Sequence, residues 1–382
     1  MVGKYLKIGI EARAIIHETR GIGRFTFEIL TALNQVAPEN EYYLFTDKHI
    51  VVPTGLQCKN ILVERRYTPW THWDLYFMAK KMNVDLMFFP ANTCWFNPAC
   101  PTVVTLHDMA PYIYRDKFYI DRKTAAYYGL NHFNIKRVSN RIVTVSEYSK
   151  KDIVKYLKIA GHKIDVIYDA VSKNFRPLAN KEQALKDLQN KYKIPATFFL
   201  FVGGLDFRKN INKLIDAFIL LKQRKNINHG LVLVGPSEIG LESLYPSYRE
   251  IIKQNNLEAD IIIPGRITDD DLIKFYNCAD VFVFPSFMEG FGIPPLEAMS
   301  CGCPVVASKA TSIPEVVGDA AVLVDPHDVQ DIANGIENIL YDLNLRKTLI
   351  DSGFARVNLF SWERAAKLLL GTFYRTIDEV ML

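Results

Sequence analysis

The chain has 382 residues, of which 49% are hydrophobic and 23% charged, an ordinary composition for a globular protein and a length that predicts two domains. No apolar run approaches the roughly 18 residues needed to cross a membrane, and the apolar stretch near the start is too short for a secretory signal. The six cysteines form no CxxC pair and have no histidine partner at zinc spacing, so we expect reduced thiols and a cytoplasmic location.

The net charge of +4 is unevenly distributed along the chain. Residues 1–180 hold 25 Lys and Arg against 16 Asp and Glu, a net charge of +9, while the remainder holds 21 against 26, a net charge of −5. A solvated basic surface accounts for the first value. A contact with the inner face of a membrane or with a lipid-phosphate acceptor also accounts for it. A nucleic-acid partner is not expected, since the chain has no basic run and no nucleic-acid motif.

Apolar strands alternate with helices along the first half, which predicts a parallel α/β layer structure. The expected elements are a strand at 6–10, a polar loop at 11–20, a helix opening near Gly23, strands at 41–45 and 61–63, a helix at 65–83, strands at 84–89 and 101–106, a helix at 117–140, a strand at 141–145, a helix at 149–157 with Ser146 as N-cap, and a strand at 165–168. Residues 169–180 have the composition of a linker.

The second half repeats this alternation and adds glycine-bearing loops after its strands. Strands are expected at 197–202, 230–234, 261–263, 280–285, 304–307 and 321–324, helices at 211–224, after Thr268, from Pro294 and at 313–318, and a helical tail from 329. The glycine-bearing loops are 203–210, 235–236, 265–267 and 290–292. Because the carboxyl ends of parallel strands meet at one edge of a sheet, these four loops predict a ligand site there.

Two cations and two carboxylates mark these loops. Arg208 and Lys209 are expected at the start of a helix, where the helix dipole disfavours positive charge unless an anion such as pyrophosphate is bound. Glu289 and Glu297 lie at the two ends of the sequence EGFGIPPLE, whose loop and helix start offer backbone N–H groups to an anion. An anion site beside hydroxyl-binding carboxylates fits a nucleotide sugar. Surface bases and helix-start acids are the alternative interpretation.

Two motifs of the first half leave both a structural and a functional role open. His107 follows a strand and precedes Asp108, so the two residues are either a structural pair or part of a site. Gly21-Ile22-Gly23 lacks the third glycine and the tight strand-to-helix turn of a dinucleotide fingerprint, so its glycines serve a turn or a ligand. We expect no required metal, because the chain has no DxD, no EF-hand loop and no His/Cys cluster.

Taken together, these motifs resemble those of the retaining glycosyltransferases of family 4. The matching segments are Gly21–Arg24, TLHD (105–108), VSEYSKKDI (145–153), FVGGLDFRKN (201–210), Pro264-Gly265-Arg266 and the two glutamates of EGFGIPPLE, an EX7E signature. The resemblance implies the GT-B fold, two facing Rossmann-like domains with a cleft between them. The implied domains are 1–172 on the acceptor side, 173–361 for the nucleotide sugar, and a helix at 362–382 that returns to the first domain.

The resemblance also implies roles for individual residues. The catalytic group would be Glu289, Lys209, Arg208 and His107, with Glu289 on the transferred sugar and the two cations on the diphosphate. Residues implied in substrate binding are Glu297 on the ribose, then Phe291, Gly292, Gly290, Ile293, Gly203, Gly204, Gly21, Gly23, Gly235, Arg266 and Ile267. The family's hinge tends to carry Asn-Gly where this chain has Asp169-Ala170.

The implied reaction is a metal-independent transfer in which the leaving phosphate helps to deprotonate the acceptor hydroxyl, with retention of configuration. No pair of glycosidase-type carboxylates is evident. UDP-glucose and GDP-mannose both fit as donors, and the acceptor would be a glycan or lipid-linked glycan in cell-surface or exopolysaccharide synthesis. The aromatic and basic helices 65–83 and 117–140 either pack into the core or contact such an acceptor at the membrane. An epimerase, a glycan phosphorylase and a non-enzymatic nucleotide-sugar-binding protein are the alternatives.

Overall fold

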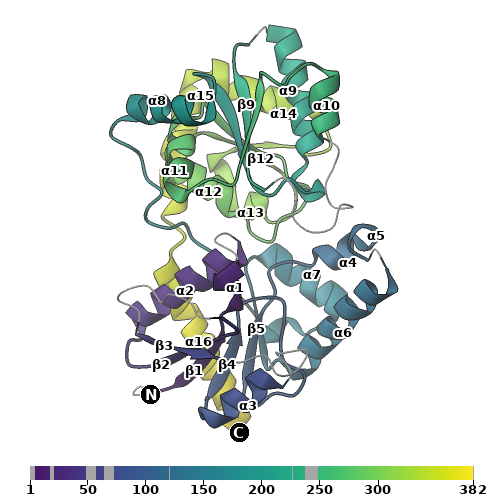
Figure 1. Ribbon diagram of the computed structural model, residues 1–382, viewed down its shortest axis with the longest axis vertical. Coiled ribbons are helices and arrows are strands. Elements are labelled where there is room, and N and C mark those ends of the chain that lie inside the picture. The colour runs from purple at the N-terminus through teal and green to yellow at the C-terminus, as the bar shows by residue number, and fades with distance from the viewer. Residues whose placement is uncertain are drawn as a thin grey trace. The chain divides into compact units, whose positions relative to one another are not determined.

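The computed structural model shows an α/β protein with two compact units, each built on one parallel sheet (Figure 1). Unit 1 consists of Met1–Asp169 and Ser361–Leu382, and unit 2 of Ala170–Phe360. The structure describes residues 5–17, 21–48, 57–63, 73–119, 121–225, 227–236 and 248–381. The α/β class with two Rossmann-like sheets is therefore confirmed.

The sheet of unit 1 has the strand order β3-β2-β1-β4-β5-β6-β7, with all neighbours parallel. Its strands are β1 (Lys7–Glu11), β2 (Glu41–Thr46), β3 (Cys58–Leu62), β4 (Leu86–Phe89), β5 (Thr102–Thr105), β6 (Arg141–Thr144) and β7 (Ile164–Val166). Its helices are α1 (Arg13–His17), α2 (Ile22–Val36), α3 (Asp74–Lys81), α4 (Ala110–Ile113), α5 (Arg115–Phe118), α6 (Arg122–Val138), α7 (Glu147–Leu157) and α16 (Trp362–Met381). β4 and β5 are buried on both faces, as the uninterrupted apolar runs in this sequence predict.

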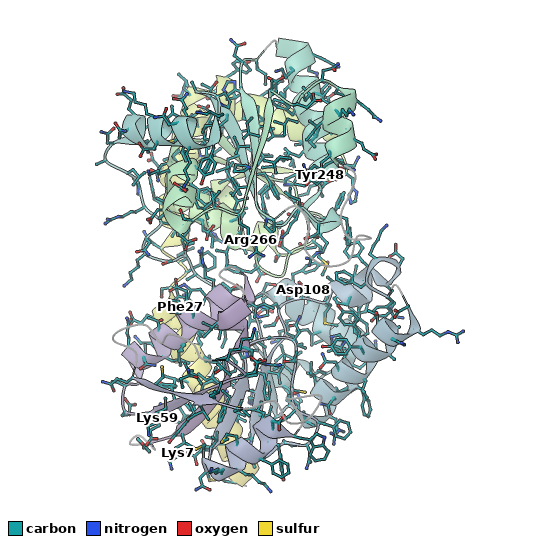
Figure 2. All side chains as sticks on the ribbon, in the orientation of Figure 1. Lys7, Phe27, Lys59, Asp108, Tyr248 and Arg266 are labelled. Carbon is teal, nitrogen blue, oxygen red and sulfur yellow. The ribbon has the colours of Figure 1, made fainter. Side chains whose placement is uncertain are left out.

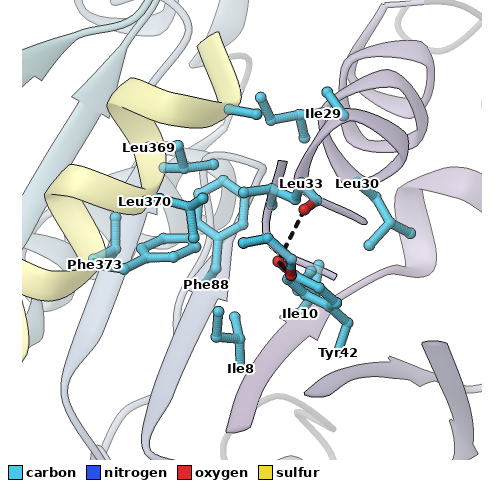
Figure 3. Packing of buried hydrophobic residues seen from close by; sticks show 14 of the residues in the cluster. Ile8, Ile10, Ile29, Leu30, Leu33, Tyr42, Phe88, Leu369, Leu370 and Phe373 are labelled. Carbon is cyan, nitrogen blue, oxygen red and sulfur yellow. Dashed lines mark hydrogen bonds between the residues drawn. The ribbon is translucent and has the colours of Figure 1, made fainter. Parts of the chain in front are cut away.

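The C-terminal helix belongs to unit 1. Leu369, Leu370 and Phe373 of α16 pack into the core that α2 and one face of the sheet form (Figure 3). The ring of Phe373 lies 5.4 Å from that of Phe88 on β4. Helices α3, α6 and α7 cover the opposite face of the sheet, so both faces are buried.

Unit 2 has the strand order β10-β9-β8-β11-β12-β13, again with all neighbours parallel. Its strands are β8 (Phe198–Val202), β9 (Gly230–Val234), β10 (Ile261–Gly265), β11 (Val281–Phe284), β12 (Val305–Ser308) and β13 (Val322–Val324). Its helices are α8 (Lys181–Tyr192), α9 (Ile211–Lys225), α10 (Tyr248–Gln254), α11 (Asp269–Cys278), α12 (Ile293–Ser300), α13 (Ile313–Val317), α14 (Val329–Tyr341) and α15 (Leu343–Val357).

Several elements differ from the sequence-based expectation. The loop predicted at 11–20 contains the short helix α1, and the helix predicted at 117–140 is two helices, α5 and α6. The second begins where the Asp121 carboxylate accepts the backbone N–H of Thr124 at 2.7 Å, an N-cap bond that starts a new helix. Helix α8 was not expected from the pattern, although Asn180 caps it in the same way. Within the predicted helix 65–83, residues 65–72 lie outside the described part of the chain, and α3 begins at Asp74.

Candidate active site

The carboxyl ends of four neighbouring strands form one edge of the unit 2 sheet. The glycine-bearing loops follow β8, β9, β10 and β11, and the strand order places these four side by side, as predicted. Backbone bonds join the loops, since the Gly203 N–H donates to the Val234 carbonyl at 2.9 Å and the Gly235 N–H donates to the Gly265 carbonyl at 3.1 Å. Backbone hydrogen bonds therefore hold the loops after β8, β9 and β10 together at this edge.

Gly235 is required by the close approach of two of these loops. A Cβ atom at Gly235 would lie 1.8 Å from the Gly203 carbonyl oxygen, and the φ of +148° at Gly235 disfavours any side chain. Gly203 also faces the ring of Phe201, which a Cβ would approach to 3.1 Å. Gly204 follows it in the loop that leads to Asp206. The glycines predicted to contact a ligand thus allow the strand ends to meet.

Asp206 holds Arg208 in a short turn before α9. Residues Phe207–Lys209 form a 3₁₀ turn rather than the first turn of the helix. The Asp206 carboxylate accepts the Arg208 backbone N–H at 3.1 Å, its Nε at 2.8 Å and its Nη2 at 3.3 Å. Burial alone would raise the pKa of Asp206, but Arg208 and Lys209 outweigh it and hold the pKa below its usual value.

Lys209 and Glu289 come together across the sheet edge. The Lys209 Nζ lies 2.6 Å from Glu289 Oε1, and both side chains are largely shielded from water. The same ammonium lies 5.5 Å from the centre of the Phe284 ring at the end of β11. The Phe287 N–H donates to the Arg208 carbonyl at 2.7 Å, which joins the two loops that carry this pair. Two residues 80 positions apart therefore form one charged centre.

The loop after Glu289 is fixed by Ser312, which is fully buried. The Ser312 hydroxyl lies 3.0 Å from the Glu289 carbonyl oxygen and 2.9 Å from that of Phe291, so its single hydrogen is shared between them, while the Glu289 N–H donates to the Thr311 hydroxyl at 3.2 Å. Phe291 is buried and packs edge-on against the Phe360 ring at 5.6 Å. The acid in this loop thus has a rigid backbone.

The turn into α12 is built on Gly292. Its φ of +107° favours glycine, and a Cβ there would meet Ile313 at 2.5 Å. Ile293 opens the helix, and prolines follow in the first turn. The half-buried Gly290 precedes this turn. After β10, Arg266 is exposed and Ile267 half-buried (Arg266 is labelled in Figure 2).

Glu297 lies one turn into α12 and is almost completely buried. Its Oε2 accepts the Tyr276 hydroxyl of α11 at 2.9 Å. The Tyr276 ring is itself fully buried and packs against Phe282 at 5.4 Å. Tyr276 therefore orients one oxygen of this carboxylate.

In unit 1, His107 is held at the end of β5 by the loop after β4. Its backbone N–H donates to Asn92 Oδ1 at 3.0 Å, and its Nε2 lies 2.8 Å from the Pro90 carbonyl. Because a carbonyl oxygen only accepts, Nε2 carries the hydrogen and Nδ1 is left as the acceptor of the neutral ring. Burial lowers the pKa of His107 and favours that neutral form, although Pro90 and Asp108 act in the opposite direction.

The neighbours of His107 come from three helices. Phe25 of α2 meets its ring edge-on at 5.0 Å, and the Ser149 hydroxyl of α7 donates to its carbonyl at 3.0 Å. The Asp108 carboxylate accepts the Ala110 N–H at 2.8 Å, at the start of α4 (Asp108 is labelled in Figure 2). Gly21, with a φ of +62°, is the N-cap of α2, and Gly23 lies buried in the first turn.

Sequence reasoning missed several residues that hold these groups. Asp206 and Asn210 flank the two cations, and Asn210 donates to the carbonyls of Pro285 at 3.0 Å and Pro326 at 2.7 Å. Ser312 fixes Glu289 by a hydrogen bond to its carbonyl, and Asn92 fixes His107 by accepting its backbone N–H. The signal for Asp206 was the Asp-x-Arg spacing of a short capped turn. Nothing local to Ser312 or Asn92 indicates its partner, which is distant in sequence.

Two family descriptions match successive parts of this chain. Residues 186–356 match the family described as glycosyl transferases group 1, and residues 21–175 match glycosyltransferase family 4. The serotype-specific mannosyltransferase WbdA of Escherichia coli is 33% identical over 278 residues, which are 73% of this chain and 34% of WbdA. The match thus spans about a third of the length of that relative.

A second relative and a solved structure match over greater shares of their length. The O-antigen chain mannosyltransferase RfbU of Salmonella typhimurium is 29% identical over 332 residues, 84% of this chain and 87% of RfbU. The crystal structure of Anabaena Alr3699/HepE in complex with UDP-glucose has a TM-score of 0.75 at 17% identity and covers 97% of this chain and 100% of that one. This likeness assigns the GT-B fold. No helix within the described ranges has the length and apolarity to span a membrane.

Proposed function

This chain belongs to glycosyltransferase family 4, and we propose that it transfers a hexose from a nucleoside-diphosphate sugar to a saccharide or lipid-linked saccharide in bacterial cell-surface polysaccharide synthesis. The observation that carries the proposal is the Lys209–Glu289 ion pair at the carboxyl edge of the unit 2 sheet. A cation for a diphosphate beside a carboxylate for sugar hydroxyls is what such a donor requires. The backbone amides of Phe291 and Gly292 and the Arg208 side chain supply further anion-binding groups.

Our proposed mechanism is direct transfer on the face that the leaving group departs from. The bond between the anomeric carbon and the phosphate oxygen breaks, and the acceptor oxygen bonds to the same carbon. The acceptor proton passes to the departing diphosphate, so atoms and charge balance and configuration is retained. Lys209 and Arg208 stabilise the charge that develops on the diphosphate, which lowers the barrier. Glu289 orients the sugar, and Glu297 with Tyr276 behind it binds the ribose hydroxyls.

The sugar that we propose is mannose, with glucose as the alternative. WbdA is described as a serotype-specific mannosyltransferase and RfbU as an O-antigen chain mannosyltransferase. We propose a glycan or lipid-linked glycan as acceptor, reached at the inner face of the membrane by the basic first half of the chain. The neutral His107 would accept a hydrogen bond from a donor hydroxyl through Nδ1. We propose no resident metal, and transfer that persists in excess EDTA would support this.

Two variants test the proposed centre. Lys209→Ala and Glu289→Ala should each reduce transfer at least about a hundredfold, because each removes a group directed at the reacting sugar phosphate. Circular dichroism should show that both proteins stay folded. The matched controls are Lys186→Ala and Glu182→Ala, which break a solvent-exposed ion pair on α8 and should leave transfer unchanged. Full activity in both site variants would reject the proposal.

The donor is identified by thermal shift. A panel of nucleotides and nucleotide sugars, measured against the wild-type chain, should show stabilisation by one base and one sugar, because a ligand that binds only the folded state raises its melting temperature. The same donor incubated without acceptor should give no epimer. Rapid conversion of the donor to its epimer would instead assign an epimerase.

A further inference from the structure

Helix α6 exposes an apolar stripe on its outer side. Tyr127, Leu130 and Phe133 are 60%, 59% and 62% exposed, although side chains of this kind are usually buried. They are spaced by three residues, so successive members lie about 60° apart and share one face of the helix. Side chains project from this helix away from the sheet (Figure 2). This helix is the one whose inner face contributes Ile135 and Val138 to the core.

The same helix carries positive charge and no negative charge. Arg122, Lys123, Lys136 and Arg137 are all exposed, and the sequence has no Asp or Glu from residue 122 to residue 146. The guanidinium of Arg137 lies 4.8 Å from the centre of the Phe96 ring, and Phe96 is itself 47% exposed. We call these eight residues the α6 surface: Phe96, Arg122, Lys123, Tyr127, Leu130, Phe133, Lys136 and Arg137.

The chemistry of the α6 surface selects an anionic lipid bilayer. The aromatic and aliphatic side chains of the exposed stripe on α6 can enter the boundary between headgroups and acyl chains, while the cations near both ends of the helix attract anionic lipids. A second copy of this chain would bring like charges together, which opposes association. Nucleic-acid binding relies on contacts between cations and phosphates, so it does not account for Leu130 or for an apolar stripe of this width.

The inner side of α6 connects this surface to His107. Asn131 Nδ2 donates to the Asn92 carbonyl at 2.7 Å, and Asn134 Nδ2 donates to the Trp95 carbonyl at 2.6 Å. Asn92 in turn accepts the His107 N–H. The surface and the strand end that carries His107 are therefore parts of one packed structure, so a bilayer bound at α6 keeps this strand end at a fixed depth.

We propose that the α6 surface docks unit 1 onto an anionic bilayer and so presents the protein to a lipid-linked acceptor. The acceptor part of this statement rests on the proposed function, whereas the docking part rests on the side chains of α6 alone.

Co-sedimentation with vesicles tests the docking. The wild-type chain should bind phosphatidylcholine vesicles that contain phosphatidylglycerol, weakly bind pure phosphatidylcholine, and lose binding in high salt. Arg122→Gln with Lys123→Gln should weaken binding about twenty-fivefold, at about fivefold per cation near an anionic leaflet. Leu130→Ser with Phe133→Ser should weaken it at least about tenfold. Because all four residues are exposed, these variants should melt like the wild type.

A matched control replaces exposed apolar residues elsewhere. Tyr341→Ser with Leu343→Ser, at two highly exposed positions in the acidic half of the chain, should bind vesicles like the wild type. Wild-type binding by both α6 variants, or equal binding to neutral and anionic vesicles, would overturn the docking proposal. So would a dimer in sedimentation velocity that the α6 variants abolish.

A second measurement separates this proposal from the proposed function. The α6 variants should keep the thermal shift with nucleotide sugar and the transfer to a detergent-dispersed acceptor, because none of the changed residues lies at the unit 2 sheet edge. Vesicle binding that depends on α6, in a protein without any transfer activity, would reject the function and keep the docking. Normal transfer with vesicle binding independent of α6 would do the reverse.

Discussion

Asp169 is a buried acid that should make the stability of this protein depend on pH. It is only 5% exposed, and its Oδ1 has no hydrogen-bond partner among the described residues. Burial raises its pKa from 3.8 to about 8. The folded state therefore holds a proton that the unfolded chain releases near pH 4. Below the unfolded pKa this acid does not change the free energy of unfolding. As the pH rises from the unfolded pKa to the folded pKa the free energy of unfolding falls, and above the folded pKa it falls no further.

The magnitude follows from the shift. A difference of about four pKa units corresponds to a loss of up to about 5 kcal/mol of unfolding free energy between about pH 4 and pH 8, with no further loss above that. Asp169→Asn keeps the shape of the side chain but cannot ionise. We expect the variant and the wild type to melt at similar temperatures at about pH 4, and the variant to melt several degrees higher at pH 9.

Thermal melting between pH 4 and pH 9 provides the measurement. The difference in melting temperature between Asp169→Asn and wild type should increase from about pH 4 to about pH 8 and then stay constant. Asp116→Asn, at an exposed position on α5, is the control and should follow the wild-type curve. Parallel curves for wild type and Asp169→Asn at every pH would show that the Asp169 carboxyl is solvated or paired, and the reasoning would be wrong.

Three further substitutions test the supporting residues. Asp206→Asn should raise the KM for the donor about tenfold with a smaller change in kcat, because the bonds to Arg208 lose their charge; an unchanged KM would limit Asp206 to capping. Gly235→Ala should lower the melting temperature by several degrees and abolish the nucleotide thermal shift, since its Cβ has no room; a variant with wild-type melting and binding would contradict this. Asn92→Ala should reduce kcat about tenfold while the protein stays folded, because the backbone N–H of His107 loses the Asn92 Oδ1 that accepts it. A normal kcat would count against a role for that contact.

The local patterns predicted most of the fold because they depend on near neighbours in sequence. The apolar run at 197–202 predicted a strand, which the structure has at Phe198–Val202, and the four glycine-bearing loops share one edge because the strands are parallel. The predictions failed where a single cap decided the boundary, as at Asp121, and where a helix had no strong apolar period, as in α8.

The sequence alone thus determined the two α/β halves, the family and the identity of the charged residues, because short sequence motifs indicate each of them. The tertiary structure decided which charges meet. Lys209 reaches Glu289 only because β8 and β11 are neighbours in the sheet, and Nε2 of His107 carries its hydrogen only because the Pro90 carbonyl lies beside it. The tertiary structure also decided which aromatic residues of α6 are exposed, because the sequence pattern does not show which of them pack into the core. Contacts between distant segments depend on strand order and on packing, and no local pattern encodes either.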